Sequence, residues 1–79
     1  MSGTKIYESS NFTDALIENT LKEVIEILRE RGYNPINQIV GYLISGDPGY
    51  ISNHKEARNK LMKFDRTKIL EVLLKNYAE

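Results

Sequence analysis

The side chains best suited to acid–base or metal chemistry are scarce in this chain. His54 is the single histidine, and there is no cysteine. A structural or catalytic zinc site needs three or four nitrogen, sulfur or carboxylate ligands. A nucleophile–histidine pair needs a third group that orients the imidazole. His54 stands beside Lys55 in a polar stretch, which is more typical of a surface histidine than of a general base. The sequence therefore predicts no enzyme, no metal and no cofactor.

The glycines of residues 45–50, SGDPGY, form the second candidate site. The segment lacks the lysine and the spacing of a phosphate-binding P-loop. Asp47 could bind a cation through its carboxylate. An aspartate followed by proline is more typical of the capped start of a helical turn. We therefore interpret Asp47 and Pro48 as a turn.

Basic side chains between residues 55 and 68 are the third candidate, as a nucleic-acid contact. They are Lys55, Arg58, Lys60, Lys63, Arg66 and Lys68. Glu56 and Asp65 interrupt the run, and the net charge of the whole chain is zero. Nucleic-acid-binding domains are generally basic overall. The sequence thus favours a solvated face and no nucleic-acid partner, and a small nucleic-acid-binding protein using residues 55–68 is kept as the alternative.

Residues 32–50 stand out because Asp47 is their one charged side chain, whereas charged residues make up 28% of the chain. Helices that face solvent normally carry charges on their outer side. The scarcity of charge predicts that a second copy of the chain or a partner covers this segment. Tyrosine suits such interfaces because it offers a large ring with a polar tip. The predicted interface residues are Tyr33, Asn34, Pro35, Asn37, Gln38, Tyr42, Asp47, Pro48 and Tyr50.

Helical periodicity dominates the rest of the chain. Residues 1–10 show no such period and are predicted to be a flexible N-terminal arm. The first helix is expected to begin with Asn11 or Thr13 as its cap and to end at Gly32. Its apolar side chains recur on one face, and they are Leu16, Ile17, Leu21, Val24, Ile25, Ile27 and Leu28.

Turn and cap signals divide the remainder into further helices. Asn34 and Pro35 predict the start of a second helix, which should end at Gly46. Asn53 with Glu56 resembles a capping box for a third helix, and Asp65 is expected to cap a fourth. The apolar positions of the fourth helix span more than half its circumference, which predicts burial on more than one side. They are Ile69, Leu70, Val72, Leu73, Leu74 and Tyr77.

These patterns predict an all-α fold: a compact bundle of four to five short helices with a flexible N-terminal arm, assembled as an intertwined homodimer. Residues 1–10 form the arm and residues 11–79 a single helical domain. A chain of 79 residues buries a small core, and domains of this size often need an oligomer for stability. No apolar run approaches the length of a membrane span or a signal peptide. The sequence therefore predicts a cytoplasmic protein without membrane insertion.

The string GYNPINQIVGYLISGDPGYI at residues 32–51, followed by Ala57, Arg58 and Asn59, resembles the signature of the IreB family of regulatory phosphoproteins. The resemblance implies a compact helical homodimer in the cytosol. It also implies a substrate of a membrane-bound eukaryotic-type Ser/Thr kinase that monitors the cell wall, with a cognate phosphatase and an unknown downstream protein as further partners. The founding member of the family negatively regulates intrinsic cephalosporin resistance.

The modification in this family falls on a threonine of the N-terminal arm. Thr4, followed by Lys5, Ile6 and Tyr7, resembles that pattern, so Thr4 is the expected phosphorylation site. A phosphate would add a charge of about −1.5 to −2 at neutral pH. The resemblance thus predicts a non-catalytic adaptor for signalling in cell-envelope stress and antibiotic resistance, controlled by phosphorylation of its arm.

Overall fold

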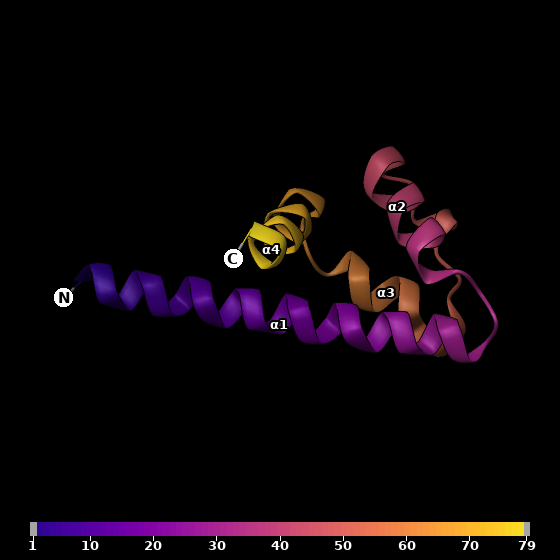
Figure 1. The fold of residues 1–79 in the computed structure, drawn as a ribbon, viewed down its shortest axis with the longest axis horizontal. Helices are drawn as coiled ribbons and strands as arrows, with labels where there is room; N and C mark the ends of the chain where they lie inside the picture. Colours follow the sequence, from indigo (N-terminus) through magenta and orange to yellow (C-terminus); the bar gives the residue numbers. More distant parts are fainter. Residues whose placement is uncertain (1, 79) are drawn as a thin grey trace.

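The computed structural model describes the backbone of residues 2–78 and the side chains of residues 12–78. Within residues 2–78 the regular elements are all helices, joined by short turns, which confirms the predicted all-α class. The elements in chain order are α1 (Ser2–Glu30), α2 (Pro35–Ser45), the 3-10 turns η1 (Pro48–Tyr50) and η2 (His54–Glu56), α3 (Ala57–Met62) and α4 (Arg66–Ala78). Figure 1 shows α1 as a long rod along which the other helices are arranged.

Helix α1 is 29 residues long and begins at Ser2, so the expected start at Asn11 or Thr13 was wrong. Adding a residue to an existing helix is far easier than starting a new one. A polar stretch can therefore extend a helix toward its N-terminus once the apolar residues that follow in the sequence have nucleated it. The flexibility of residues 1–10 concerns motion, and it stays a prediction. Met1 and the side chain of Thr4 lie outside the described residues.

The turn after α1 follows the sequence signals. Gly32 takes a left-handed conformation with φ of 85°, and its N–H donates to the Arg29 carbonyl at 3.0 Å. Asn34 then caps α2, because its Oδ1 accepts a hydrogen bond from the Asn37 N–H at 3.1 Å. Pro35 occupies the first helical turn, where its missing N–H has no partner to lose. The predicted start of the second helix is confirmed.

The end of α2 is fixed from two directions. Gly46 adopts a φ of 78°, and its N–H donates to the Tyr42 carbonyl at 2.7 Å. The Arg66 Nη1 donates to the Leu43 carbonyl at 3.0 Å, although the two residues are 23 positions apart in sequence. This bond satisfies one of the carbonyls that a helix end leaves without an internal partner. It also ties the start of α4 to the end of α2.

The capping box expected at Asn53 and Glu56 was wrong. The Asn53 side chain makes no capping hydrogen bond, and the Glu56 Oε1 accepts instead from the Asn59 Nδ2 at 2.8 Å. Lys55 and Glu56 both have positive φ, 50° and 66°. The chain therefore leaves the helical path after a single turn, and α3 begins only at Ala57.

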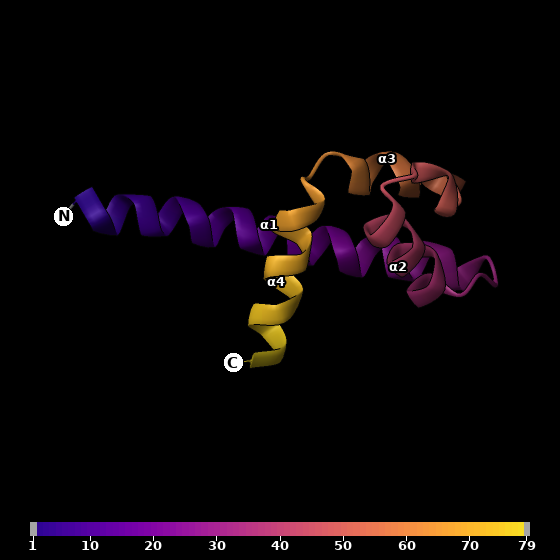
Figure 2. The same ribbon diagram turned by 90° about the horizontal axis from the view of Figure 1, so that it is seen from above.

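The core lies where α1 meets the other helices. Figure 2 shows α4 crossing α1 at a steep angle, with α2 and α3 packed near the C-terminal end of α1. Side chains from all four helices and from Ile51 fill this core. They are Ile17, Leu21, Val24, Ile27, Leu28, Ile39, Tyr42, Leu43, Ile51, Ala57, Leu61, Ile69 and Val72. Within residues 2–78, every helix is too short or too polar to cross a membrane.

Gly41 lies inside α2, where an alanine would ordinarily be more favourable by about 1 kcal/mol. Here the ring of Tyr50, in η1, covers the glycine. A Cβ added to Gly41 would meet the ring, with the Tyr50 Cγ only 2.9 Å away. This close approach explains a glycine in a helix interior.

Substitution of Gly41 by alanine should therefore destabilise the protein, although replacing a glycine inside a helix by alanine usually stabilises it. In the wild-type background it is expected to destabilise the protein by about 1–3 kcal/mol, because the new methyl group overlaps the ring. In a Tyr50→Ala background the same substitution should stabilise α2 by about 1 kcal/mol. Urea unfolding followed by circular dichroism measures both differences. Stabilisation by Gly41→Ala in both backgrounds would contradict the packing described here.

Candidate association interface

Helix α2 has two apolar sides. Ile39, Leu43 and Tyr42 face the core and are at most 8% exposed. Ile36, Val40 and Ile44 are 59%, 45% and 79% exposed. Because these three recur every fourth residue, they lie along the same side of the helix. The chain thus leaves one apolar side of α2 uncovered.

Helix α4 is also apolar on two sides. Ile69 and Val72 are buried against the core. The other apolar side chains of the helix are exposed, and they are Leu70, Leu73, Leu74 and Tyr77. The chain itself buries only the side of α4 that holds Ile69 and Val72, so the expected burial of α4 on more than one side stays a prediction.

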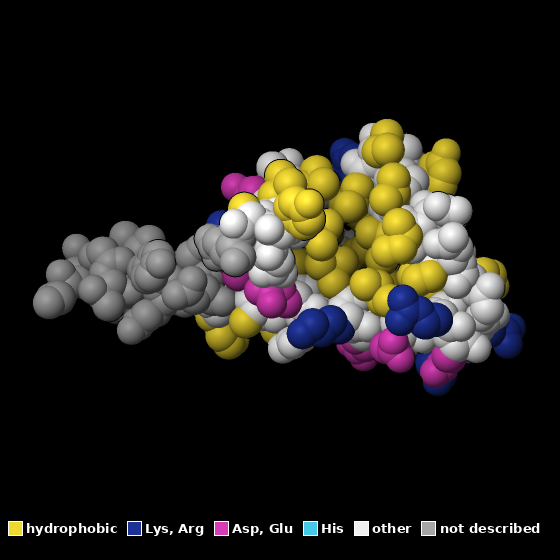
Figure 3. All heavy atoms as spheres, in the orientation of Figure 1, with side chains coloured by type: hydrophobic (Ala, Val, Ile, Leu, Met, Phe, Trp, Pro, Cys, Tyr) yellow, Lys and Arg dark blue, Asp and Glu magenta, His cyan; other side chains and the backbone are white. Residues whose placement is uncertain are grey.

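The uncovered sides of α2 and α4 belong to one surface. Figure 3 shows apolar side chains gathered between the two helices, around a hollow in the surface. We call this surface the α2–α4 apolar face and define it by Ile36, Val40, Ile44, Leu70, Leu73, Leu74 and Tyr77. Monomeric soluble proteins rarely expose a contiguous patch of several large apolar side chains, and such a patch marks a contact site.

Several of the predicted interface residues have partners inside the chain. Asn34 caps α2, and the Asp47 Oδ1 accepts from the Gly49 N–H at 2.8 Å. The Gln38 Oε1 accepts from the Ser52 N–H at 2.9 Å. Pro35 and Tyr42 are buried. These five side chains therefore shape α2 and its surroundings.

The other predicted interface residues lie nearer the surface. Tyr33, Asn37 and Tyr50 are exposed, and Pro48 is half-buried. Participation of each of these nine residues in an interface stays a prediction. The exposed residues of α4 were absent from that prediction, although the wide apolar arc of the helix was the signal that could have added them.

The basic residues of 55–68 are largely engaged within the chain. Lys55, Lys60 and Lys68 form ion pairs with Glu30, Glu23 and Asp14 of α1. The Arg58 Nε donates to the Ile51 carbonyl at 2.9 Å, and Arg66 donates to Leu43. A nucleic-acid contact would have to break these interactions before the side chains could reach phosphates. The arrangement therefore does not favour the nucleic-acid alternative.

His54 lies beside the ion pair between Lys55 and Glu30. Its Nε2 is 3.8 Å from the Glu30 Oε1, and Lys55 donates to the same carboxylate oxygen. These contacts hold η2 against the end of α1. Among the side chains that the structure describes, no three of the histidine, aspartate and glutamate residues cluster as metal ligands would.

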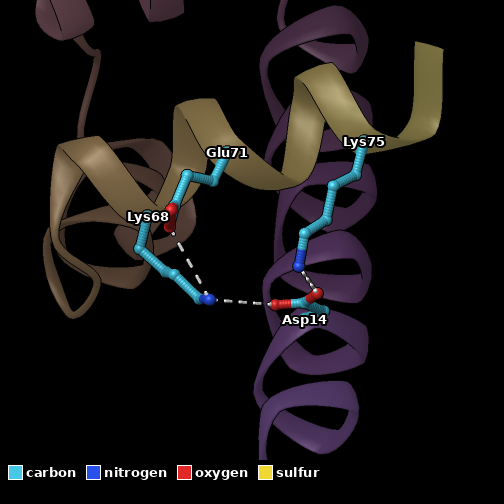
Figure 4. A network of polar contacts seen from close by, with 4 residues as sticks. All are labelled: Asp14, Lys68, Glu71 and Lys75. Atoms are coloured by element: carbon cyan, nitrogen blue, oxygen red, sulfur yellow. Dashed lines mark hydrogen bonds and ion pairs between the residues drawn. The ribbon is translucent and has the colours of Figure 1, made fainter. Parts of the chain in front are cut away.

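Asp14 joins α1 to α4 through two lysines (Figure 4). The Lys75 Nζ donates to the Asp14 Oδ2 at 2.9 Å, and the Lys68 Nζ lies 3.4 Å from the Oδ1. Lys68 also approaches Glu71 at 3.7 Å. The Asp14 side chain is only 14% exposed. The hydrogen bond from Lys75, together with the positive charge of Lys68, holds the pKa of Asp14 below its usual value of 3.8.

The lowered pKa gives a testable dependence of stability on pH. A carboxyl group whose pKa is lower in the folded state stabilises the fold above its unfolded pKa, and this contribution is lost as pH falls through the folded pKa. Asp14→Asn should therefore destabilise the protein at neutral pH, and its difference from wild type should shrink below pH 3.8.

Urea unfolding midpoints from pH 7 to pH 2 measure this dependence. Glu26→Gln is the control, because Glu26 pairs with Arg29 on the same helix in a largely exposed contact. A wild-type advantage over Asp14→Asn that is constant across the range would rule out the ionic role of Asp14.

Comparison with known protein families shows a match along nearly the whole chain. The family model described as IreB regulatory phosphoprotein matches residues 2–79. The match includes the low-charge segment that forms α2 and η1, as well as the exposed side of α4. The α2–α4 apolar face thus lies entirely within the part of the chain that the family model covers.

Proposed function

Because this chain belongs to the IreB family of regulatory phosphoproteins, we propose that it is a non-catalytic adaptor that works as a homodimer and is controlled by phosphorylation of Thr4. The kinase would be a membrane-bound eukaryotic-type Ser/Thr kinase, opposed by its cognate phosphatase. The pathway would be cytoplasmic signalling in cell-envelope stress, with an effect on cephalosporin resistance. An unidentified downstream protein receives the signal.

The α2–α4 apolar face is the observation that carries the homodimer in this proposal. Its side chains recur at helical spacing on both helices, which is the pattern that another helix packs against. A second copy of the chain offers the same two stripes. A two-fold axis through the face would place α2 and α4 of one copy against those of the other, so that one surface serves both partners.

The small size of the domain supports a second copy of the chain as the partner that covers the α2–α4 apolar face. A domain of 79 residues buries a smaller share of its apolar surface than a larger domain does. Here Ile44 and Leu74 remain 79% and 67% exposed. Pairing of two copies would remove these side chains from water and add to the stability of the fold.

The phosphorylation part of the proposal rests on family membership and on the sequence around Thr4. Phosphate adds negative charge to a segment that is attached to α1. Because α1 contacts α2, α3 and α4, a change near its N-terminus can reach the α2–α4 apolar face through packed and ionic contacts.

Three measurements test this function. Light scattering of the purified protein should give the mass of a dimer at micromolar concentration, and a mass of one chain at all concentrations would overturn the homodimer. Phosphosite mapping from native cells should find Thr4 modified, and loss of the kinase should remove the modification. A Thr4→Ala strain with unchanged cephalosporin sensitivity would overturn control through Thr4.

A further inference from the structure

The contacts that hold α4 differ around its circumference. Ile69 and Val72 are buried against the core. Lys68 and Lys75 are seven residues apart, so at about 100° per residue they point in nearly the same direction. Both reach Asp14 on α1. Leu70, Leu73 and Tyr77 lie about 150–170° away from the two lysines around the helix. The two ion pairs therefore add to the core contacts of Ile69 and Val72 in fixing the rotation of α4 about its own axis. This rotation sets the direction in which the apolar side points.

The Asp14 carboxylate contacts the two lysines unequally. The Asp14 Oδ1 is buried and accepts no hydrogen bond among the described residues, and Lys68 stands 3.4 Å from it. Lys68 divides its charge between Asp14 and Glu71, which is 3.7 Å away. A phosphate monoester carries nearly twice the charge of a carboxylate and has three acceptor oxygens. Such a group could bond to both lysines at once.

We propose that Lys68 and Lys75 form a phosphate-receiving site, which Asp14 occupies in the unmodified protein and from which a phosphate on Thr4 displaces it. This inference rests on the proposed phosphorylation of Thr4. It adds the place where the phosphate binds and the reason why binding changes the α2–α4 apolar face: α4 loses its restraint by Asp14 and rotates.

The distance along the chain permits this capture only if α1 unwinds at its start. Thr4 and Asp14 are ten positions apart in the sequence, which is about 15 Å along a helix and up to about 33 Å when extended. A phosphate held on a straight helix stays away from the lysines. Residues 2–10 include Gly3 and three serines, which are weak helix formers, so the free energy needed to unwind them is small.

The test uses the full chain with phosphothreonine incorporated at position 4 during synthesis, so that no kinase is needed. Phosphorus NMR titration reports the second pKa of the phosphate directly. Two neighbouring ammonium groups should lower this pKa by about one unit relative to the K68Q/K75Q variant. The control K22Q/K63Q also removes two lysines, at exposed positions of α1 and of the end of α3, and should keep the lowered pKa.

The Asp14→Asn variant provides a second test, which remains valid if K68Q/K75Q fails to fold. Asp14→Asn keeps both lysines and removes the competing anion, so it should lower the phosphate pKa further. Phosphorylation should also reduce the helical circular dichroism of the wild type, and it should raise its dimer dissociation constant by about tenfold. Equal phosphate pKa values in the wild type, K68Q/K75Q and Asp14→Asn would overturn the receiving site.

Failure of the receiving site can be distinguished from failure of the proposed function. The phosphate titration needs neither a dimer nor a kinase. A monomeric protein, or an unmodified Thr4 in cells, would overturn the proposed function and leave the titration result standing. A dimer that is phosphorylated in cells but shows equal phosphate pKa values would overturn only the receiving site.

Discussion

Replacement of Val40 by glutamate is expected to convert the proposed dimer into a folded monomer. Val40 lies in the middle of the exposed stripe of α2, between Ile36 and Ile44, and is 45% exposed in the single chain. A glutamate there can stay hydrated in the monomer, so the fold should survive. In the dimer the same carboxylate would be buried without a partner, which costs several kcal/mol. Since 1.4 kcal/mol is a factor of ten, we expect the dimer dissociation constant to rise at least about a hundredfold.

Sedimentation equilibrium measures this change, and circular dichroism confirms that the monomer remains helical. The control is Asn19→Glu, which adds the same charge at an exposed position on the side of α1 away from its buried residues. It should change the association constant by less than about a factor of three. Surface substitutions away from buried or paired groups usually change the free energy by no more than about 0.5 kcal/mol. A Val40→Glu protein that stays dimeric would show that the second copy binds elsewhere.

Leu61→Ala is expected to have the largest effect on stability. Leu61 is fully buried, and it anchors α3, a helix of only six residues, against α1. Removal of a buried leucine side chain costs about 2–5 kcal/mol, because apolar contacts are lost and a cavity remains. Small domains have a total stability of about 5–15 kcal/mol. The midpoint of thermal unfolding should therefore fall by roughly 10–20 °C.

The neighbouring Met62 provides the matched comparison. It lies on the same short helix but is 45% exposed, so Met62→Ala should change the free energy of unfolding by less than about 1 kcal/mol. Both variants are compared by urea unfolding at one protein concentration, because self-association also adds to apparent stability. Equal effects of the two substitutions would mean that α3 does not pack on α1 through Leu61.

The low-charge segment illustrates how far sequence reasoning reaches. The cap at Asn34, the proline after it and the left-handed glycine at position 46 are all signals that act within four residues. Such local signals fix where α2 starts and ends without help from the rest of the fold. At Asn53 and Glu56 a similar pattern failed. There the positive φ of Lys55 and Glu56 accompanies the ion pair that joins Lys55 to Glu30 of α1, a contact that no local pattern contains.

The sequence by itself determined the helical class, the turns around α2 and an excess of apolar surface on α2 and α4, because each depends on residues close together in the chain. It also carried the family signature. Only the tertiary structure decided which apolar side of each helix faces inward, since that depends on how α1 is crossed by the others. It alone placed Tyr50 over Gly41, and it brought Lys75 to Asp14 across 61 residues of sequence. Contacts between distant segments arise from packing of the whole chain, and local periodicity holds no information about them.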